Sequence, residues 1–328
     1  MMTDATRSTV DVVIPTRDRP AQLAATLTAL TKQVSGDFGI IVVDDGGATA
    51  AQALVPAAVR DVLTIRFLRN ESSIGPGLSR NHGVAASAAD YVVFLDDDCV
   101  AVPEVVDRHR AALTRARGPV VSLGPILSPP GQRLSVWNHW DADRLEREYA
   151  RLRDKVATPA WTHLYTGNVG VRRKDFVAVG GFDSRFGRQE DVELGYRLDQ
   201  LGCRFEFDSG ATVFHDSDRS LESWLRIPVI SAHFDVLMDR LDPDSDRVAM
   251  VKAGLHDKHW AVRLVRRIAW APIGRRWATH GVVGAGRLLH SLRADRAGLA
   301  AFSVAWDLTY CEALRDALAM RDHVGVSP

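Results

Sequence analysis

Three consecutive carboxylates, Asp96, Asp97 and Asp98, directly follow a short apolar run at residues 91–95. Adjacent carboxylates repel one another, and burying them without a counter-charge is costly. Their oxygens are hard ligands that suit Mg²⁺ or Mn²⁺, and these ions in turn bridge phosphate oxygens. The triplet therefore predicts a divalent metal site for a phosphorylated ligand. The alternative is an acidic loop in water.

The elements that would position the triplet form a regular alternation. Apolar, β-branched runs predict strands at 10–14, 39–43, 63–68 and 91–95. Helices are expected at 21–31 and 50–59, and a loop entering a helix at 75–88. This order predicts an α/β fold with a mostly parallel sheet flanked by helices. The triplet and the pair Asp44-Asp45 each follow a strand, at the sheet edge where such folds bind ligands.

The rest of the chain is expected to divide near residue 219. A helix is predicted at 102–116, a strand at 120–127, a helix at 145–155, a strand at 164–171, a helix at 191–201 and strands at 203–207 and 212–215. In the 191–201 helix, Leu194, Leu198 and Leu201 are expected on one apolar side. From residue 221 onward helix predominates. We therefore expect a tail at 1–9, an α/β domain at 10–219 and a helical region at 220–328.

Composition favours a soluble globular protein. The chain has 328 residues, of which 46% are hydrophobic and 25% charged, and its formal net charge is zero. That balance gives no electrostatic case for binding nucleic acid. Three widely spaced cysteines without a C-x-x-C pair indicate neither a disulfide framework nor a zinc site. Because no signal-peptide core and no run of eighteen apolar residues is present, a cytoplasmic protein is expected.

Several further motifs stand in a fixed order around the triplet. They are Pro15-Thr16-Arg17-Asp18-Arg19, Val43-Asp44-Asp45-Gly46, Gly75-Pro76-Gly77-Leu78-Ser79-Arg80-Asn81, Thr166-Gly167-Asn168, Gly180-Gly181-Phe182-Asp183 and Glu190-Asp191-Val192-Glu193-Leu194. With the triplet, this set resembles the family 2 glycosyltransferases over about residues 10–218. The resemblance implies an inverting enzyme of the GT-A fold that uses a nucleotide sugar.

The resemblance implies a nucleotide site built from three segments. Its residues would be Pro15, Thr16 and Arg19 of the first loop, Asp45 after the second strand, and Gly75 and Arg80 of the glycine-rich turn and helix. In the family the residue matching Asp45 accepts a hydrogen bond from a uracil N–H. The alternatives are a turn-forming Asp45 before Gly46 and an Arg80 that is simply solvated.

The resemblance also implies how the triplet holds Mn²⁺ or Mg²⁺. Asp98 would be the direct ligand, Asp96 would support it, and Asp97 would face the ribose or a metal-bound water. His215, after the strand at 212–215, resembles the third protein ligand of some relatives, and neutral imidazole can bind Mn²⁺. The alternative is a structural histidine.

An inverting transfer needs a base for the acceptor, and the resemblance assigns it to Asp191. Glu190 would orient the acceptor or the base. Acids also begin many helices for stability alone, because the helix dipole favours them there. Gly167 and Asn168 would border the donor sugar, where a glycine permits close approach of the backbone.

Together these features predict transfer of one sugar, from a UDP-sugar, to a small-molecule, natural-product or lipid-linked acceptor. The sequence lacks the Q-x-x-R-W element and the transmembrane helices of processive relatives. One alternative is a sugar nucleotidyltransferase, although residues 10–19 lack the glycine-rich loop of that class. The other is a non-catalytic carbohydrate- or nucleotide-binding relative, which the intact triplet and Asp191 disfavour.

The region after residue 220 lies outside the resemblance. Trp260 and the arginines Arg263, Arg266 and Arg267 predict a basic amphipathic helix. Such a helix can lie on an anionic membrane surface. The alternatives are packing on the catalytic domain and a clamp for an anionic acceptor. A second amphipathic helix is expected at 299–320, for packing or for a homodimer.

Overall fold

The computed structural model describes residues 9–216, 219–256 and 275–323. Contacts divide the chain into two units. The α/β unit comprises Met1–Gly131 and Leu145–Asp216, and the helical unit comprises Gln132–Arg144 and Ser217–Pro328. The predicted tail lies outside the described residues except for Thr9.

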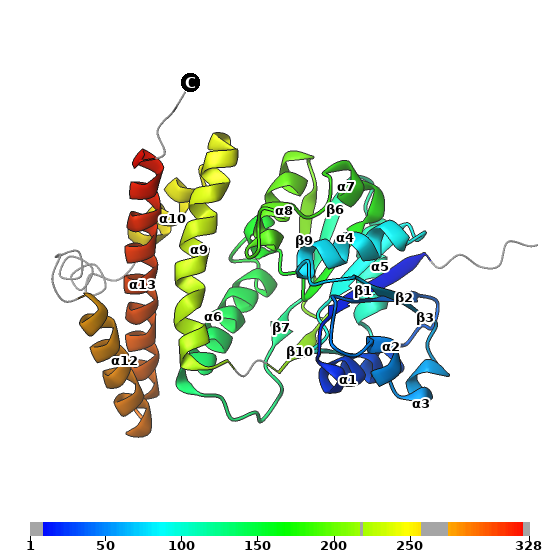
Figure 1. Ribbon diagram of the computed structural model, residues 1–328, viewed down its shortest axis with the longest axis horizontal. Helices are drawn as coiled ribbons and strands as arrows, with labels where there is room; N and C mark the ends of the chain where they lie inside the picture. Colours follow the sequence, from blue (N-terminus) through cyan, green and yellow to red (C-terminus); the bar gives the residue numbers. More distant parts are fainter. Residues whose placement is uncertain (1–8, 217–218, 257–274, 324–328) are drawn as a thin grey trace, which may run out of the picture. The chain divides into compact units, whose positions relative to one another are not determined.

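A seven-stranded sheet forms the centre of the α/β unit (Figure 1). Its strands, in spatial order, are β3 (Ile65–Arg69), β2 (Gly39–Asp44), β1 (Val10–Thr16), β4 (Tyr91–Leu95), β8 (Asn168–Arg172), β6 (Val120–Leu123) and β9 (Arg204–Phe207). Only β8 runs antiparallel to its neighbours, β4 and β6. The predicted α/β fold with a mostly parallel sheet is therefore confirmed.

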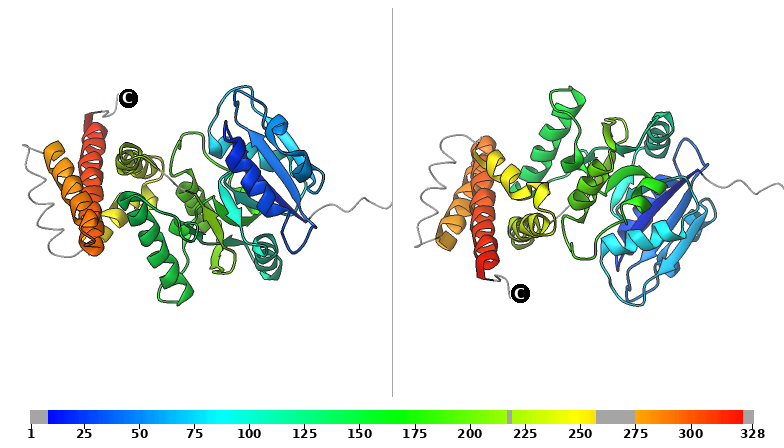
Figure 2. Two further views of the ribbon diagram at one scale, coloured as in Figure 1. Left: turned by 90° about the horizontal axis from the view of Figure 1, so that it is seen from below. Right: turned by 90° about the horizontal axis from the view of Figure 1, so that it is seen from above.

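Helices cover both faces of this sheet. They are α1 (Pro20–Leu30), α4 (Pro76–Ala86), α5 (Val105–Arg115), α7 (Arg173–Ala178) and α8 (Glu190–Gln200). Figure 2 shows α1 and α4 on opposite faces. Because side chains alternate along a strand, Val12 of β1 joins the core with Leu27 of α1, whereas Val13 lies under Gly83 of α4. A Cβ on Gly83 would lie 2.5 Å from Val13 Cγ1, so only glycine allows this close packing.

Some predicted elements have different boundaries. Residues 50–59 form two short helices, α2 (Ala51–Leu54) and α3 (Ala57–Arg60), because Pro56 disfavours helical geometry at Val55. Residues 164–167 precede β8 and follow a 3-10 turn (η1, Trp161–His163), so the strand predicted at 164–171 begins late. Leu201 lies beyond the end of α8 and is 41% exposed, so its predicted place on the apolar side is wrong.

A second, three-stranded sheet lies in the same unit. It consists of β5 (Cys99–Ala101), β10 (Val213–His215) and β7 (Ile126–Leu127). The strand predicted at 120–127 is divided after β6, and its last two residues join this small sheet. β10 pairs antiparallel with β5, and this register sets His215 opposite Cys99.

The helical unit is built from long helices. They are α9 (Leu221–Leu241), α10 (Arg247–His256), α12 (Arg275–Ser291) and α13 (Asp295–His323), with a 3-10 turn η2 (Pro243–Ser245) and the first part of α6 (Val136–Arg153). α13 packs against α9 and α12. Aromatic rings fill the core: Trp140 lies 5.3 Å from Trp224 and 5.0 Å from Trp306 between ring centroids.

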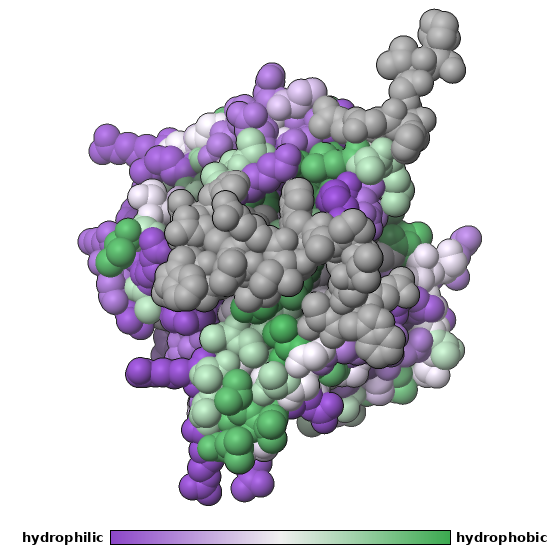
Figure 3. Space-filling view, turned by 90° about the vertical axis from the view of Figure 1, so that its left-hand side faces the viewer, coloured by the Kyte–Doolittle hydropathy of each residue, from purple (hydrophilic) through white to green (hydrophobic). Residues whose placement is uncertain are grey.

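The surface of this unit bears on the predicted membrane contact. Among the described helices, none is both long and apolar enough to cross a membrane. Trp260 and its neighbouring arginines lie outside the described residues, so the membrane contact stays a prediction. Figure 3 shows hydrophobic side chains gathered toward the lower end of the face that it draws. Leu288 of α12 is 60% exposed, and Leu292, just after this helix, is 68% exposed. The helix predicted at 299–320 lies within α13.

Candidate active site

The candidate site forms where β1, β2 and β4 end. Thr16 and Asp44 are paired across β1 and β2, and the amide N–H of Asp45 donates to the Thr16 carbonyl. β4 lies on the other side of β1. This strand order brings the loop after β1 between Asp45 and the aspartate triplet. All residues of this site belong to the α/β unit.

Asp97 points into the protein rather than toward solvent. Its Oδ2 accepts a hydrogen bond from Thr16 Oγ1 at 2.7 Å, and its Oδ1 accepts one from Arg19 Nη1 at 2.7 Å. Burial raises the pKa of Asp97 to about 6, although the Thr16 hydrogen bond and the Arg19 charge act in the opposite direction. Asp97 therefore joins the first loop to the triplet and fixes the position of Arg19.

Asp98 binds its two partners through one oxygen. Its Oδ2 lies 2.5 Å from Arg19 Nη2 and 3.0 Å from His215 Nε2. Burial favours the neutral acid, but His215 and Arg19 outweigh it, so the pKa of Asp98 lies below its usual value. Within the described part of the chain, the buried Oδ1 of Asp98 has no hydrogen-bond partner. A buried carboxylate oxygen in this state fits a bound cation.

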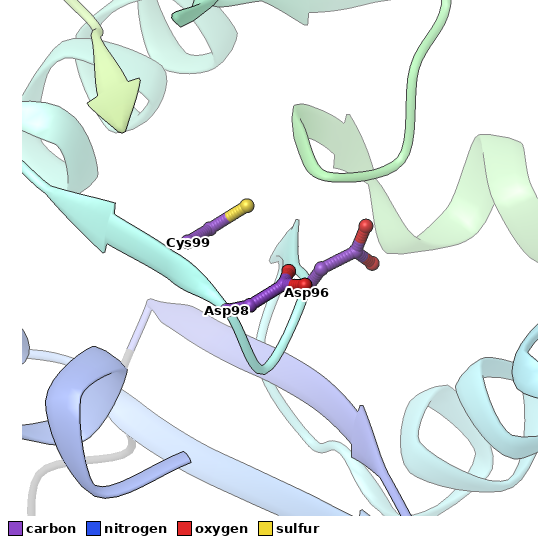
Figure 4. A group of neighbouring side chains, drawn as sticks. All are labelled: Asp96, Asp98 and Cys99. Carbon is purple, nitrogen blue, oxygen red and sulfur yellow. The ribbon is translucent and has the colours of Figure 1, made fainter. Parts of the chain in front are cut away.

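Asp96 and Asp98 fit a divalent metal ion together. One oxygen of each, with Sγ of Cys99, lies within 4.8 Å of the others (Figure 4). Asp98 points toward Asp96 in this view. Two carboxylates are a donor set that Mg²⁺ and Mn²⁺ accept. The β5–β10 pairing places His215 beside Asp98, because His215 lies opposite Cys99, the residue that follows Asp98.

Arg80 links the triplet to Glu190, the neighbour of the predicted base. It lies on α4, and its side chain is only 3% exposed. Its Nη2 lies 2.5 Å from Asp96 Oδ1, and its Nη1 lies 3.4 Å from Glu190 Oε1. Its guanidinium lies over the Phe182 ring, 5.6 Å from the centroid. Arg80 is therefore not a solvated helix residue. Its guanidinium joins two carboxylates, and the predicted contact with a nucleotide stays a prediction.

Asp191 lies in the first turn of α8, next to Glu190. The residue before the helix, Gln189, has a left-handed φ of 59°, and it turns the chain into α8. Burial, together with the neighbouring Glu190 charge, raises the pKa of Asp191 to about 7. Such a carboxylate is a stronger base than an exposed one, and its pKa is matched to proton transfer near neutral pH.

Asp45 is surrounded by protein donors. It accepts five hydrogen bonds, listed here by donor: Asn70 Nδ2, Ser73 Oγ, the Ile74 N–H, the Gly75 N–H and Ser79 Oγ. These bonds outweigh burial and lower the pKa of Asp45 to about 2. Asp45 thus anchors the loop that leads to α4 and Arg80. The predicted contact with uracil stays a prediction, and it would add a donor to a carboxylate that already accepts five.

We expect Asp45→Asn to destabilise the protein by about 1–3 kcal/mol, because the amide turns an N–H₂ group toward donors. The wild-type carboxylate has a folded pKa of about 2 against a usual 3.8. Its contribution is therefore complete above about pH 4 and is lost as the pH falls toward 2. Urea unfolding across this pH range measures the effect. Asp37→Asn, at an exposed position, is the control, and an equal pH slope in Asp45→Asn and wild type would contradict the assignment.

Gly167 and Asn168 lie beside the triplet because Asn168 pairs with Leu95 across β8 and β4. A Cβ on Gly167 would lie 3.1 Å from Asp96 Oδ2, so a glycine keeps this approach open. The Asn168 side chain points inward, where Nδ2 donates to the carbonyls of Pro125 and Ala211. Its Oδ1 lies 2.9 Å from His109 Nε2. A donor-sugar contact through this side chain stays a prediction.

Two other predicted residues lie near the end of a strand and just before a helix. Pro15 is part of β1 and pairs with Val43 of β2. Gly75 precedes α4 with φ 89°, a backbone conformation that favours glycine, and its N–H points to Asp45. The structure thus brings Thr16 and Arg19 into contact with Asp97 and Asp98. Arg80 connects the remaining member of the triplet, Asp96, with Glu190.

The sequence reasoning missed two buried side chains near the site. Cys99 faces Asp96 and Asp98. His109 lies between Ser122 Oγ and Asn168 Oδ1, both at 2.9 Å, and burial lowers its pKa. Asn168 uses Nδ2 as a donor elsewhere, so the His109 Nε2–H donates to its Oδ1. The signal for His109 was its spacing, since it falls on the same face of α5 as Val105 and Leu113.

The sequence and the fold of this chain are both similar to those of known proteins. Residues 11–180 match the family model described as glycosyl transferase family 2. The chain is 30% identical over 222 residues to pre-mycofactocin glycosyltransferase of Mycobacterium tuberculosis, an alignment that covers 66% of this chain and 44% of the relative. It is 30% identical over 219 residues to validoxylamine A glucosyltransferase of Streptomyces hygroscopicus, covering 59% of this chain and 52% of the relative. The chain spans about half the length of these curated relatives.

Solved structures share the fold at low sequence identity. The mannosyltransferase PcManGT of Pyrobaculum calidifontis, solved in complex with GDP-Man and Mn²⁺, matches with a TM-score of 0.57 at 13% identity. That alignment covers 99% of this chain and 78% of PcManGT. S. aureus TarS 1–349 in complex with UDP matches with a TM-score of 0.50 at 16% identity, covering 94% of this chain and 91% of TarS. The family model spans more than half of the chain, which therefore belongs to glycosyl transferase family 2.

Proposed function

We propose that this protein transfers a single sugar from a nucleotide sugar to an acceptor, with inversion and with assistance from Mn²⁺ or Mg²⁺. One observation carries the proposal. Asp98 has a buried oxygen without a hydrogen-bond partner among the described residues, and one of its carboxylate oxygens groups with one of Asp96. Arg80 joins Asp96 to the turn that carries Asp191. The proposal therefore has a place for a cation and a place for a base in one connected site.

Asp98 and Asp96 would hold the metal ion, with His215 as a third ligand. A divalent ion there supplies Lewis acidity to the leaving diphosphate. Arg19 forms ion pairs with Asp97 and Asp98, and Arg80 forms one with Asp96. Thr16 and Pro15 would border the nucleotide, with Asp97 directed toward Thr16.

Asp191 would remove the proton from the attacking acceptor hydroxyl. Its pKa of about 7 means that a large fraction is ionised at neutral pH and that the carboxylate is basic. Glu190 Oε1 accepts a hydrogen bond from Arg80 Nη1 at 3.4 Å. Because this contact occupies the carboxylate, Glu190 is better suited to orienting a neighbouring group than to acting as the base. A single in-line attack on the anomeric carbon then inverts its configuration.

We infer that the donor is a UDP-sugar. Support comes from the resemblance of Asp45 to the uracil-binding position and from the fold shared with a TarS complex containing UDP. PcManGT was solved with GDP-Man, so guanosine donors belong in the same test. Two relatives are named for one compound each, pre-mycofactocin and validoxylamine A. These names support a small-molecule or natural-product acceptor over a lipid-linked one.

The test is a thermal-shift screen of UDP- and GDP-sugars with Mn²⁺, followed by measurement of nucleotide release with acceptor candidates. A UDP-sugar that stabilises the protein only in the presence of metal, and then yields UDP, would support the proposal. Absence of any metal-dependent shift across both donor classes would contradict it. Release of pyrophosphate from a nucleoside triphosphate and a sugar 1-phosphate, tested in parallel, would favour a sugar nucleotidyltransferase, and donor binding without transfer would favour a non-catalytic relative.

We expect His215→Ala to weaken Mn²⁺ binding by roughly 10–100-fold, whether the imidazole binds the metal or orients Asp98. His215 Nε2 lies 3.0 Å from the Asp98 carboxylate, so its loss alters the metal-binding oxygens directly. Isothermal titration with Mn²⁺ measures the affinity. His233→Ala, on α9 of the helical unit, is the matched control. Unchanged Mn²⁺ affinity would return His215 to a purely structural part.

A further inference from the structure

Cys99 brings a sulfur atom to the candidate metal site. The thiol is fully buried, and its Sγ lies within 4.8 Å of one oxygen of Asp96 and one of Asp98. The Cys99 N–H donates to the Asp96 carbonyl at 3.2 Å, which closes the chain into a tight turn. Figure 4 shows the three side chains leaving this turn. The turn therefore arranges two carboxylates and a thiol around one small space.

Two observations indicate that this space suits an ion. Asp98 is 7% exposed, and its buried Oδ1 finds no hydrogen-bond partner among the described residues. Gly167 lines the same space, since a Cβ there would lie 3.1 Å from Asp96 Oδ2 and 3.6 Å from Cys99 Sγ. A larger residue at position 167 would fill the gap between the sulfur and the oxygen.

Asp96 and Asp98 thus have two different third donors nearby. His215 reaches Asp98 from β10, and Cys99 begins the strand that pairs with it. Thiolate ligands select softer cations such as Zn²⁺ and Cd²⁺, whereas Mg²⁺ and Mn²⁺ prefer oxygen. The identity of the ion therefore decides whether the sulfur takes part.

We propose that Cys99 completes a second donor set, thiolate with two carboxylates, which binds Zn²⁺ or Cd²⁺ and excludes Mn²⁺. This inference rests on the metal site of the proposed function and adds a thiophilic mode to it. On binding, the thiol S–H bond breaks, the proton passes to water, and a sulfur–metal bond forms. An ion drawn toward Cys99 occupies the carboxylates that the diphosphate-binding metal needs, so Zn²⁺ and Cd²⁺ inhibit in competition with Mn²⁺.

The experiment is a Cd²⁺ titration of the full chain, followed by the ultraviolet sulfur-to-cadmium charge-transfer band. We expect the band to saturate near one equivalent in wild type and to be absent in Cys99→Ser. Cys203→Ser and Cys311→Ser are matched controls, since both thiols are also buried and lie elsewhere in the chain. Both controls should keep the band. A band that persists in Cys99→Ser, or that is absent in wild type, would overturn the proposal.

Two further measurements keep the proposal separate from the proposed function. Cadmium-113 NMR of the wild-type protein reports sulfur ligation without any substitution, and a shift typical of oxygen ligands alone would contradict it. Mn²⁺ affinity in Cys99→Ser should stay within a few-fold of wild type, because the hard donors are intact. If wild type shows the Cys99-dependent cadmium band but binds neither Mn²⁺ nor Mg²⁺, the result supports the thiol-containing site and contradicts metal-assisted transfer.

Discussion

Asp191→Asn is expected to lower the rate of sugar transfer by roughly 10²-fold or more, while donor binding stays within a few-fold of wild type. The amide has nearly the shape of the carboxylate, yet it cannot accept the proton of the acceptor hydroxyl. Single-turnover transfer and equilibrium binding of the donor, measured separately, test the two halves of this expectation. Asp199→Asn, an exposed acid at the other end of α8, is the control.

The pH dependence of the wild-type enzyme gives the same residue a second test. Because the pKa of Asp191 is about 7, the ionised base is lost as the pH falls below 7, and transfer should slow accordingly. Asp191→Asn should lack this limb of the profile. If the variant turns over within a few-fold of wild type, the base lies elsewhere, and Glu190 is the next residue to replace.

Asp98→Asn should abolish the increase in UDP affinity that Mn²⁺ provides, a loss of roughly 10²-fold or more for a direct ligand. The substitution keeps the side-chain shape but replaces a hard anionic oxygen. It also removes the charge that Arg19 and His215 share. Titration of UDP with and without Mn²⁺ measures the effect, and circular dichroism checks the fold.

Asp37→Asn is the control for this experiment, because Asp37 is exposed and lies before β2. Its UDP affinity should keep the full dependence on Mn²⁺. Metal-dependent UDP binding that survives in Asp98→Asn would show that the ion is held without Asp98. The metal-ligand part of the proposed function would then have to be withdrawn.

Local sequence patterns were sufficient to predict most strands of the α/β unit. The strands β1, β2 and β4 are short apolar runs whose interior residues are buried on both faces, and that signal is complete within five or six residues. The triplet after β4 was equally visible, because its position depends on one strand end. The break at Pro56 was also present in the sequence, although the single-helix interpretation of residues 50–59 overlooked it.

What the sequence could not supply depends on contacts between distant segments. Cys99 and His215 meet only through the β5–β10 pairing, and no local pattern predicts the register of a three-residue strand. Arg80 reaches Glu190 across 110 positions of sequence. The five donors to Asp45 come from a loop and a helix start that fold around it. Contacts of this kind require the three-dimensional structure, because the sequence around a charged residue is the same whether or not that residue has a partner.

Helix α6 restricts how the chain can be shortened. A truncation after residue 216 would keep every carboxylate of the candidate site, and it looks like a natural way to obtain a minimal catalytic fragment. Yet the first turns of α6 would remain, and Trp140 would lose the rings of Trp224 and Trp306 that cover it. The fragment would expose large aromatic surfaces to water and favour aggregation. A usable fragment must therefore also replace the apolar residues at 136–144 with polar ones.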